Sequence, residues 1–142
     1  MKNEELPFDE SWVEEGGENV VAFKSFGLAV RIVKFCQHLR SSKQEYVLSK
    51  QLLRSGTSVG ANVEEAIGGI SRADFSAKIS IAYKEARETS YLLKLLYATD
   101  YVEEKQFQSL LRDCEEVCRI LRAILNTTRI NKMRNDASLN EE

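Results

Sequence analysis

The sequence predicts an all-α domain built as an antiparallel, up-down-up-down four-helix bundle. Apolar residues repeat at alternating steps of three and four in four long segments, which is the pattern of a helix with one buried seam. The breaks between these segments are only a few residues long, so consecutive helices must be antiparallel neighbours. One proline, Pro7, and seven glycines are too few for the many turns of a β fold.

The first helix is expected at residues 19–40, and it carries two apolar seams. Neighbouring positions differ by about 100° around a helix, so the two seams cover more than one face. The first contains Ala22, Phe26, Ala29, Val33 and Cys36, and the second Leu28, Ile32, Phe35 and Leu39. A corner helix of a lone bundle needs one such face. The surplus indicates either a subunit interface or a broad core face.

The second helix is expected at residues 44–68, after a polar break at 41–43. Its run of small residues, 55–61, would weaken an isolated helix, because each glycine costs about 1 kcal/mol relative to alanine. Small side chains let another helix approach closely, and this is the interpretation we favour. Close approach of a ligand to the backbone is the alternative.

The third helix is expected to begin after Gly69, with Ser71 as its N-cap and Asp74 in its first turn. A break at 98–101 separates it from the fourth helix, expected at 103–131. Residues beyond 132 show no apolar period and are expected to fray. The predicted organisation is a flexible acidic arm at 1–18, the bundle at 19–131 and a disordered tail at 132–142.

The net charge of −2 is unevenly distributed. Residues 1–18 carry seven acids against one lysine, and residues 19–131 carry 17 bases against 12 acids, so a body of +5 adjoins an acidic arm. The three cysteines show no disulfide spacing, and no apolar run is long enough for a signal peptide or a membrane span. We therefore expect a cytoplasmic protein.

The sequence offers little catalytic chemistry. Di-metal bundles need Glu-x-x-His motifs, but the only histidine, His38, follows Phe35 at that spacing. Cys114 and Cys118 lie one helical turn apart on an apolar seam, which is typical of inert core thiols. Arg31 and His38 are spaced like the arginine and histidine of some helical-bundle RNases, so an RNase is the least favoured alternative. We predict no catalytic residue, no metal and no cofactor.

A basic stripe follows one edge of the fourth helix at steps of seven, three and seven. It consists of Arg112, Arg119, Arg122 and Arg129. Such a row favours nucleic-acid backbones through counterion release, although Glu115 and Glu116 interrupt it. Direct nucleic-acid binding through this face is therefore the alternative function, and the acidic arm opposes it.

Two blocks carry a family resemblance. Residues 53–66 (LRSGTSVGANVEEA) and 74–89 (DFSAKISIAYKEARET) resemble the signature of the four-helix-bundle 23S rRNA intervening-sequence proteins. The resemblance covers about residues 18–129. The first 17 residues match nothing in the family pattern. Gly60 and Ala66 also depart from it, because many relatives carry a proline near the first position and a glycine after the Asn-x-x-Glu.

The resemblance implies a non-enzymatic protein that assembles into a homopentameric ring. Relatives are encoded within insertions in bacterial 23S rRNA genes or as separate genes, and they are often labelled ribosomal proteins. Related accessory variability proteins of retroelements partner a reverse transcriptase and nucleic acid. We accordingly expect an oligomeric scaffold or accessory factor of RNA or DNA machinery, whose partners are itself and RNA, DNA or a nucleic-acid enzyme.

The polar residues of the two blocks need a separate interpretation. They are Asn62, Glu65, Lys84, Glu85, Arg87 and Glu88. Surface pairs of this kind contribute only about 0–1 kcal/mol, whereas between subunits they can form a hydrogen-bonded network that fixes register. We interpret them as structural groups between helices or subunits, with a ligand site as the alternative.

Overall fold

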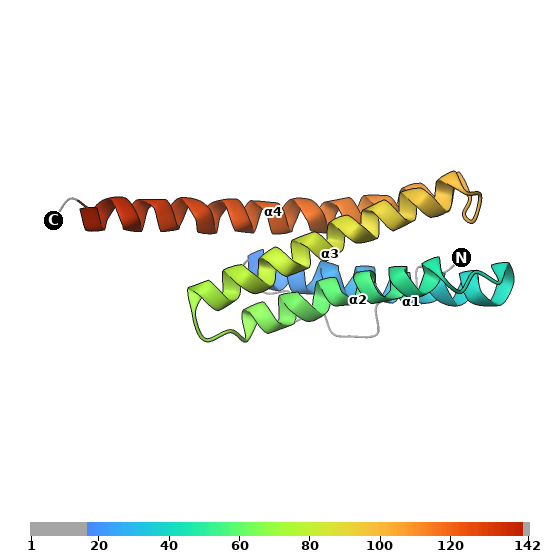
Figure 1. Ribbon diagram of the computed structural model, residues 1–142, viewed down its shortest axis with the longest axis horizontal. Coiled ribbons are helices and arrows are strands. Elements are labelled where there is room, and N and C mark those ends of the chain that lie inside the picture. Colours follow the sequence, from blue (N-terminus) through green and yellow to red (C-terminus); the bar gives the residue numbers. More distant parts are fainter. Residues whose placement is uncertain (1–16, 141–142) are drawn as a thin grey trace.

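The computed structural model describes residues 17–140, which form four α-helices and no strand (Figure 1). The helices are α1 (Gly17–Lys43), α2 (Leu48–Ile67), α3 (Arg72–Ala98) and α4 (Glu104–Asn140). Most of the predicted acidic arm, residues 1–16, lies outside the described residues, as do residues 141–142. The prediction of an all-α, four-helix fold is confirmed.

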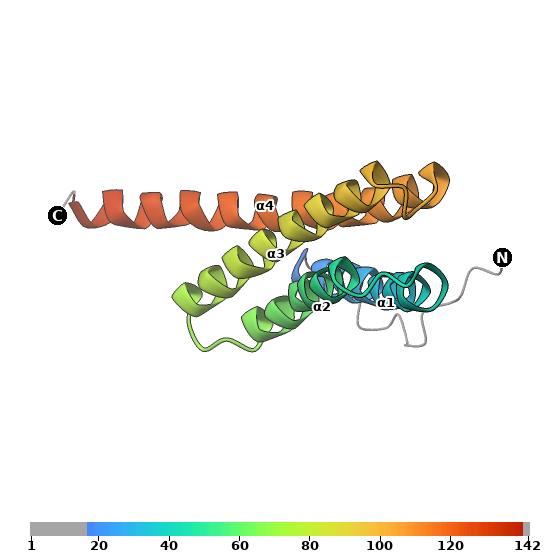
Figure 2. The same ribbon diagram turned by 45° about the vertical axis from the view of Figure 1, so that its right-hand side comes forward.

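Each helix packs against the next in sequence, and α1 also packs against α4. Contacts between α1 and α2 pair in reverse order, because Gly60 approaches Ser25 and Gly56 approaches Ile32. In Figure 1 each helix runs back across the view from the end of the one before it. Figures 1 and 2 also show that α3 diverges from α4 towards its own N-terminus, and that α4 projects beyond the α2–α3 turn.

One apolar core fills the space between the helices. Its fully buried members include Leu28, Ile32 and Leu39 of α1, Leu52, Val59 and Val63 of α2, Ile79, Leu93 and Leu96 of α3, and Leu110 and Leu121 of α4. Together with the other buried residues of the core, these positions follow steps of three, four or seven, as in Phe107, Leu110, Cys114, Val117 and Leu121 of α4. The last of them in α4 is Leu121, so the helix continues well past the core.

The small-residue run of α2 is a site of close helix packing, as predicted. A Cβ atom built on Gly56 would lie 2.7 Å from Cγ2 of Ile32, which is too close for any side chain to be accepted without a shift. At Gly60 the nearest atom, the backbone oxygen of Ser25, is 3.5 Å away, an ordinary contact. Gly56 therefore lets α1 approach α2.

The turn between α1 and α2 lies later than predicted. α1 continues through 41–43, and the break falls at residues 44–47, where Gln44 adopts a positive φ of 50°. The buried carboxylate of Glu45 accepts hydrogen bonds from the backbone amides of Val47, Leu48 and Ser49 at 3.0, 2.9 and 2.6 Å. This acidic cap starts α2, and the sequence pattern alone did not reveal it.

The same hydrogen bonds decide the charge of Glu45. Burial opposes ionisation, but the amides of Leu48, Ser49 and Val47 outweigh that effect and lower the pKa of the carboxyl. Glu45 is therefore a carboxylate that stabilises the N-terminus of α2.

The start of α3 agrees with the prediction, and the end of α4 differs from it. Ser71 is the N-cap of α3, and its Oγ accepts a hydrogen bond from the amide of Asp74 at 3.1 Å. α4 was expected to end near residue 131 but continues to Asn140. The segment has no apolar period, yet it contains no glycine or proline to stop a helix.

The two seams of α1 occupy different environments. The second seam, from Leu28 to Leu39, is buried throughout. In the first seam Ala22 and Cys36 are buried, whereas Phe26 is 45% exposed and Ala29 and Val33 are partly exposed. The surplus of apolar residues therefore lies at the surface of the single subunit. No helix within residues 17–140 is both long and apolar enough to cross a membrane.

Candidate nucleic-acid interface

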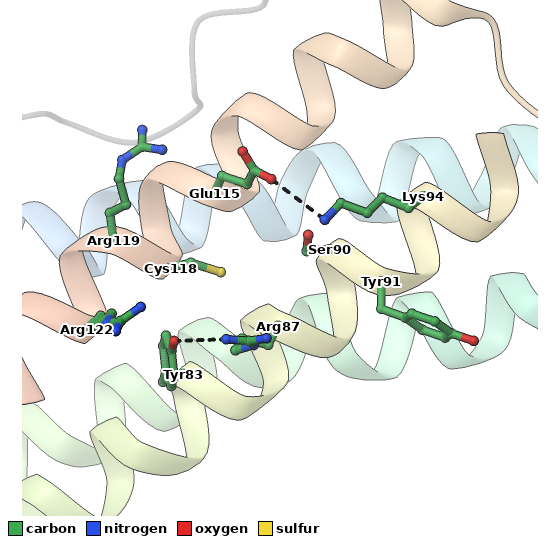
Figure 3. Close-up of a pocket in the computed structure, with 9 residues that line it drawn as sticks. All are labelled: Tyr83, Arg87, Ser90, Tyr91, Lys94, Glu115, Cys118, Arg119 and Arg122. Atoms are coloured by element: carbon green, nitrogen blue, oxygen red, sulfur yellow. Dashed lines mark hydrogen bonds and ion pairs between the residues drawn. The ribbon is translucent and has the colours of Figure 1, made fainter. Parts of the chain in front are cut away.

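A groove of about 480 Å³ lies between the middle of α3 and α4 (Figure 3). α3 contributes one wall and α4 the other. The lining residues are Tyr83, Arg87, Ser90, Tyr91, Lys94, Glu115, Cys118, Arg119 and Arg122. The volume falls within the range of pockets that bury a small organic ligand.

The groove is strongly cationic, because its lining contains four basic side chains and only one carboxylate. That carboxylate, Glu115, lies 4.0 Å from the Nζ of Lys94, the longest of the ion pairs within residues 17–140. Neither Arg119 nor Arg122 has a carboxylate partner in this part of the chain. Their charge is therefore available to an anion.

Two tyrosines of α3 belong to the same groove. Arg87 donates a hydrogen bond to the Tyr83 hydroxyl at 3.3 Å, and its guanidinium lies 5.9 Å from the centre of the Tyr83 ring. Tyr91 is 62% exposed. Figure 3 shows Arg122 reaching towards α3 on the side of Arg87 and Tyr83, Arg119 on the rim pointing away from α3, and Tyr91 towards the other end.

Two of the three cysteines lie at this groove. Cys114 is buried and donates a hydrogen bond to the backbone oxygen of Ala86 at 3.3 Å, whereas Cys118 is partly exposed and lines the groove. Its neighbour Cys114, together with the charges of Arg87 and Arg119, lowers the pKa of the Cys118 thiol against the effect of burial. The pKa of the Cys114 thiol is raised by its neighbour Cys118 and by burial. Of the two thiols, Cys118 is the one that a reagent in the groove can reach.

The structure divides the predicted arginine stripe. Arg119 and Arg122 line the groove, whereas Arg112 and Arg129 are exposed on α4 outside it. The groove adds Arg87 and Lys94 from α3, which the one-helix pattern could not reveal because they become neighbours only when α3 packs on α4. Of these two, only Arg87 was among the predicted site residues.

The other residues of the polar signature are dispersed over α2 and α3. The Asn62 side chain donates to the backbone oxygen of Ser58 at 2.8 Å, within its own helix. Glu65 pairs with Lys78 across the α2–α3 contact at 2.8 Å, and both side chains are well exposed. Lys84 is exposed. These groups do not converge on a single site within one subunit.

Glu85 and Glu88 do converge, on an arginine that the predicted set omitted. Arg54 of α2 lies 3.2 Å from the Glu85 carboxylate and 2.6 Å from that of Glu88. Below this cluster the Thr89 hydroxyl donates to the hydroxyl of Ser55 at 2.9 Å, and both side chains are buried. Arg54 lies inside the first family block, and this is the signal that could have identified it.

Arg31 and His38, the two residues of the RNase alternative, have different surroundings. Arg31 bridges α1 and α4 by donating to Asp113 Oδ2 at 2.5 Å and to the Ser109 hydroxyl at 2.9 Å. His38 is exposed. Arg31 thus has a structural role. No group of three metal-ligating side chains occurs within residues 17–140.

A second, wider groove separates the diverging parts of α3 and α4. It has a volume of about 1360 Å³, and its apolar lining includes Phe75, Ala77, Ile120, Ala123 and Ile124. Ile130, Met133 and Leu139 of α4 do not line this groove and are also exposed. Apolar side chains therefore continue along α4 after the last core contact.

Comparison with known proteins gives a family and similar solved structures. Residues 17–123 match the family described as 23S rRNA-intervening sequence protein. A crystal structure of a protein of unknown function from the S23 ribosomal protein family of Bacteroides thetaiotaomicron is 47% identical, with a TM-score of 0.77. That alignment covers 78% of this chain and 99% of the other. No curated protein matches the chain.

Proposed function

Because the chain belongs to the 23S rRNA-intervening sequence protein family, we propose that it is a non-enzymatic, oligomeric scaffold of cytoplasmic RNA or DNA machinery. Its subunit is an up-down-up-down bundle, and its assembly is a homo-oligomeric ring of five copies. The observation that carries this proposal is the wide apolar groove between α3 and α4, together with the part of α4 that extends past the core.

The extended part of α4 favours a helical partner. Isolated helices shorter than about 12–15 residues are marginal in water, and most helical stability in proteins comes from packing of an apolar face. Residues 126–140 are almost entirely exposed in the single subunit, and Ile130, Met133 and Leu139 lie among them. A second copy of the chain, packed in the wide groove and along α4, would cover these side chains.

The Arg54 cluster, formed by Arg54, Glu85 and Glu88, gives this assembly a further surface. Glu85 and Glu88 already draw Arg54 across from α2, and all three remain accessible at the surface of one subunit. Polar groups at a subunit contact specify register by hydrogen bonding. In this proposal the signature residues orient neighbouring copies rather than bind a small ligand.

Light scattering tests the proposal, with a matched pair of variants. Ala123 is exposed and lines the wide groove, whereas Gln108 is exposed near the other end of the same helix, outside both grooves and outside residues 126–140. Both Ala123→Glu and Gln108→Glu add one negative charge. The wild type and Gln108→Glu should have a mass of several subunits, five in a ring, each of 16.2 kDa. Ala123→Glu should be monomeric at micromolar concentration. A monomeric wild type would exclude the scaffold.

Direct nucleic-acid binding is a second candidate, and the cationic groove favours it. Neutralising Arg112, Arg119, Arg122 and Arg129 together should flatten the salt dependence of binding, because fewer counterions are released. Absence of measurable binding of the wild type at about 50 mM salt would exclude this function.

A further inference from the structure

We infer that the cationic groove between α3 and α4 binds single-stranded nucleic acid, with phosphates held by Arg87 and Arg122 and a base stacked at Tyr91. This inference rests on the second proposed function and names its site and its ligand. The inferred site is the groove between two helices, whereas the sequence alone indicated a row of arginines on α4.

The charges of the groove suit a phosphodiester. Arg87 on one wall and Arg122 on the other supply planar guanidinium groups, which match phosphate oxygens by two parallel hydrogen bonds. The Tyr83 hydroxyl, already 3.3 Å from Arg87, lies on the same side of the groove (Figure 3). The groove's one acid, Glu115, is turned towards Lys94. A phosphate between Arg87 and Arg122 therefore meets no carboxylate.

The tyrosines and the size of the groove favour a single strand over a duplex. Proteins that bind single strands combine a cationic groove with aromatic rings on which bases stack, and a base is accessible for stacking only when it is unpaired. Tyr91 is the most exposed aromatic side chain of the groove, at 62%. A volume of about 480 Å³ admits a nucleotide, whereas a duplex would contact only the rim.

Cys118 provides a reporter at the floor of the groove. Cys36 and Cys114 are buried, so Cys118 is the accessible thiol among the described residues. Arg87 and Arg119 act on its ionisation. A strand bound in the groove would cover the sulfur and neutralise these cations, so alkylation of Cys118 by iodoacetamide should slow.

The experiment measures binding of a labelled single strand of about 12 nucleotides at about 50 mM salt, by fluorescence anisotropy, with a duplex of the same sequence in parallel. Arg87→Gln and Arg122→Gln should each weaken single-strand binding several-fold and reduce the salt slope by about 1. Tyr91→Leu should weaken single-strand binding about tenfold and leave duplex binding unchanged. Arg40→Gln removes an exposed arginine of α1, outside the groove, and is the control. Circular dichroism confirms that each variant is folded.

The outcomes separate the site from the function. Slower alkylation of Cys118 with bound strand, together with the losses above, supports the inference. If the strand binds but Cys118 stays reactive and the groove variants bind normally, the groove is not the site, although nucleic-acid binding stands. If Arg112→Gln and Arg129→Gln weaken binding as much as Arg122→Gln, or if duplex binds as tightly as the single strand, the groove inference is wrong. If no nucleic acid binds, the second proposed function fails with it.

Discussion

The contact between α1 and α2 is closed, whereas the contact between α3 and α4 is open over much of its length. In the first contact, Gly56 of α2 leaves room for the Ile32 side chain of α1, and Glu45 caps the N-terminus of α2. In the second, two grooves separate the helices, and α4 extends past the core. The difference indicates that one half of the molecule is complete in a single chain and the other half offers surfaces to other molecules.

The largest expected effect is a difference in the free energy of unfolding between variants in the core part of α4 and variants in its extension. Leu121 is fully buried and Ile130 is 51% exposed. Leu121→Ala should lower the free energy of unfolding by about 2–5 kcal/mol, because it removes buried methyl groups and leaves a cavity. Ile130→Ala should change it by less than about 0.5 kcal/mol. Urea denaturation in the Ala123→Glu background, where assembly is blocked, measures both; equal losses would show that the extension belongs to the core.

The next effect concerns the close contact between α1 and α2. Gly56→Ala should destabilise the protein by about 1–3 kcal/mol, because the added Cβ meets Ile32 at 2.7 Å and the core must shift. Gly60→Ala places the same atom at an ordinary distance and should stabilise α2 by up to about 1 kcal/mol through helix propensity. Thermal denaturation of the two variants should therefore move in opposite directions. A shift of the same sign in both would contradict close packing at Gly56.

A smaller effect concerns the cap of α2. Glu45→Gln should cost about 1 kcal/mol at neutral pH, since the carboxylate accepts three backbone amides. The folded pKa of Glu45 lies below its ordinary value of 4.5, so its stabilisation is fully present above that value and is lost as the pH falls through the folded pKa. The gap in unfolding free energy between wild type and variant should be constant from pH 7 to pH 5, then close below about pH 4.5. A gap that persists at pH 2 would exclude the ionised cap.

The helices were predictable because their signals are local. The apolar period located all four, Ser71 marked the start of α3, and the small residues of α2 indicated close packing. The turn at 44–47 was missed because Glu45 caps through its side chain, which a search for the usual capping residues passes over. The continuation of α4 was missed because residues 126–140 carry only three large apolar side chains, Ile130, Met133 and Leu139, which set no regular period.

The candidate site was only half predictable. The arginines of α4 formed a visible stripe, but their partners Arg87 and Lys94 come from a helix that is distant in sequence. Arg54 illustrates the same limit, since Glu85 and Glu88 reach it only after α2 and α3 pack. Periodicity defines the face of one helix, whereas a groove depends on the register between two.

Hydrogen exchange most directly tests the claim that the α3–α4 half is completed by other copies of the chain. Amide exchange is compared between the assembled wild type and Ala123→Glu. The account predicts equal protection of α1 and α2 in the two proteins, and slower exchange of the N-terminal turns of α3 and of residues 126–140 only in the assembled form. Equal exchange of residues 126–140 in both proteins, or a loss of protection spread evenly over all four helices, would contradict it.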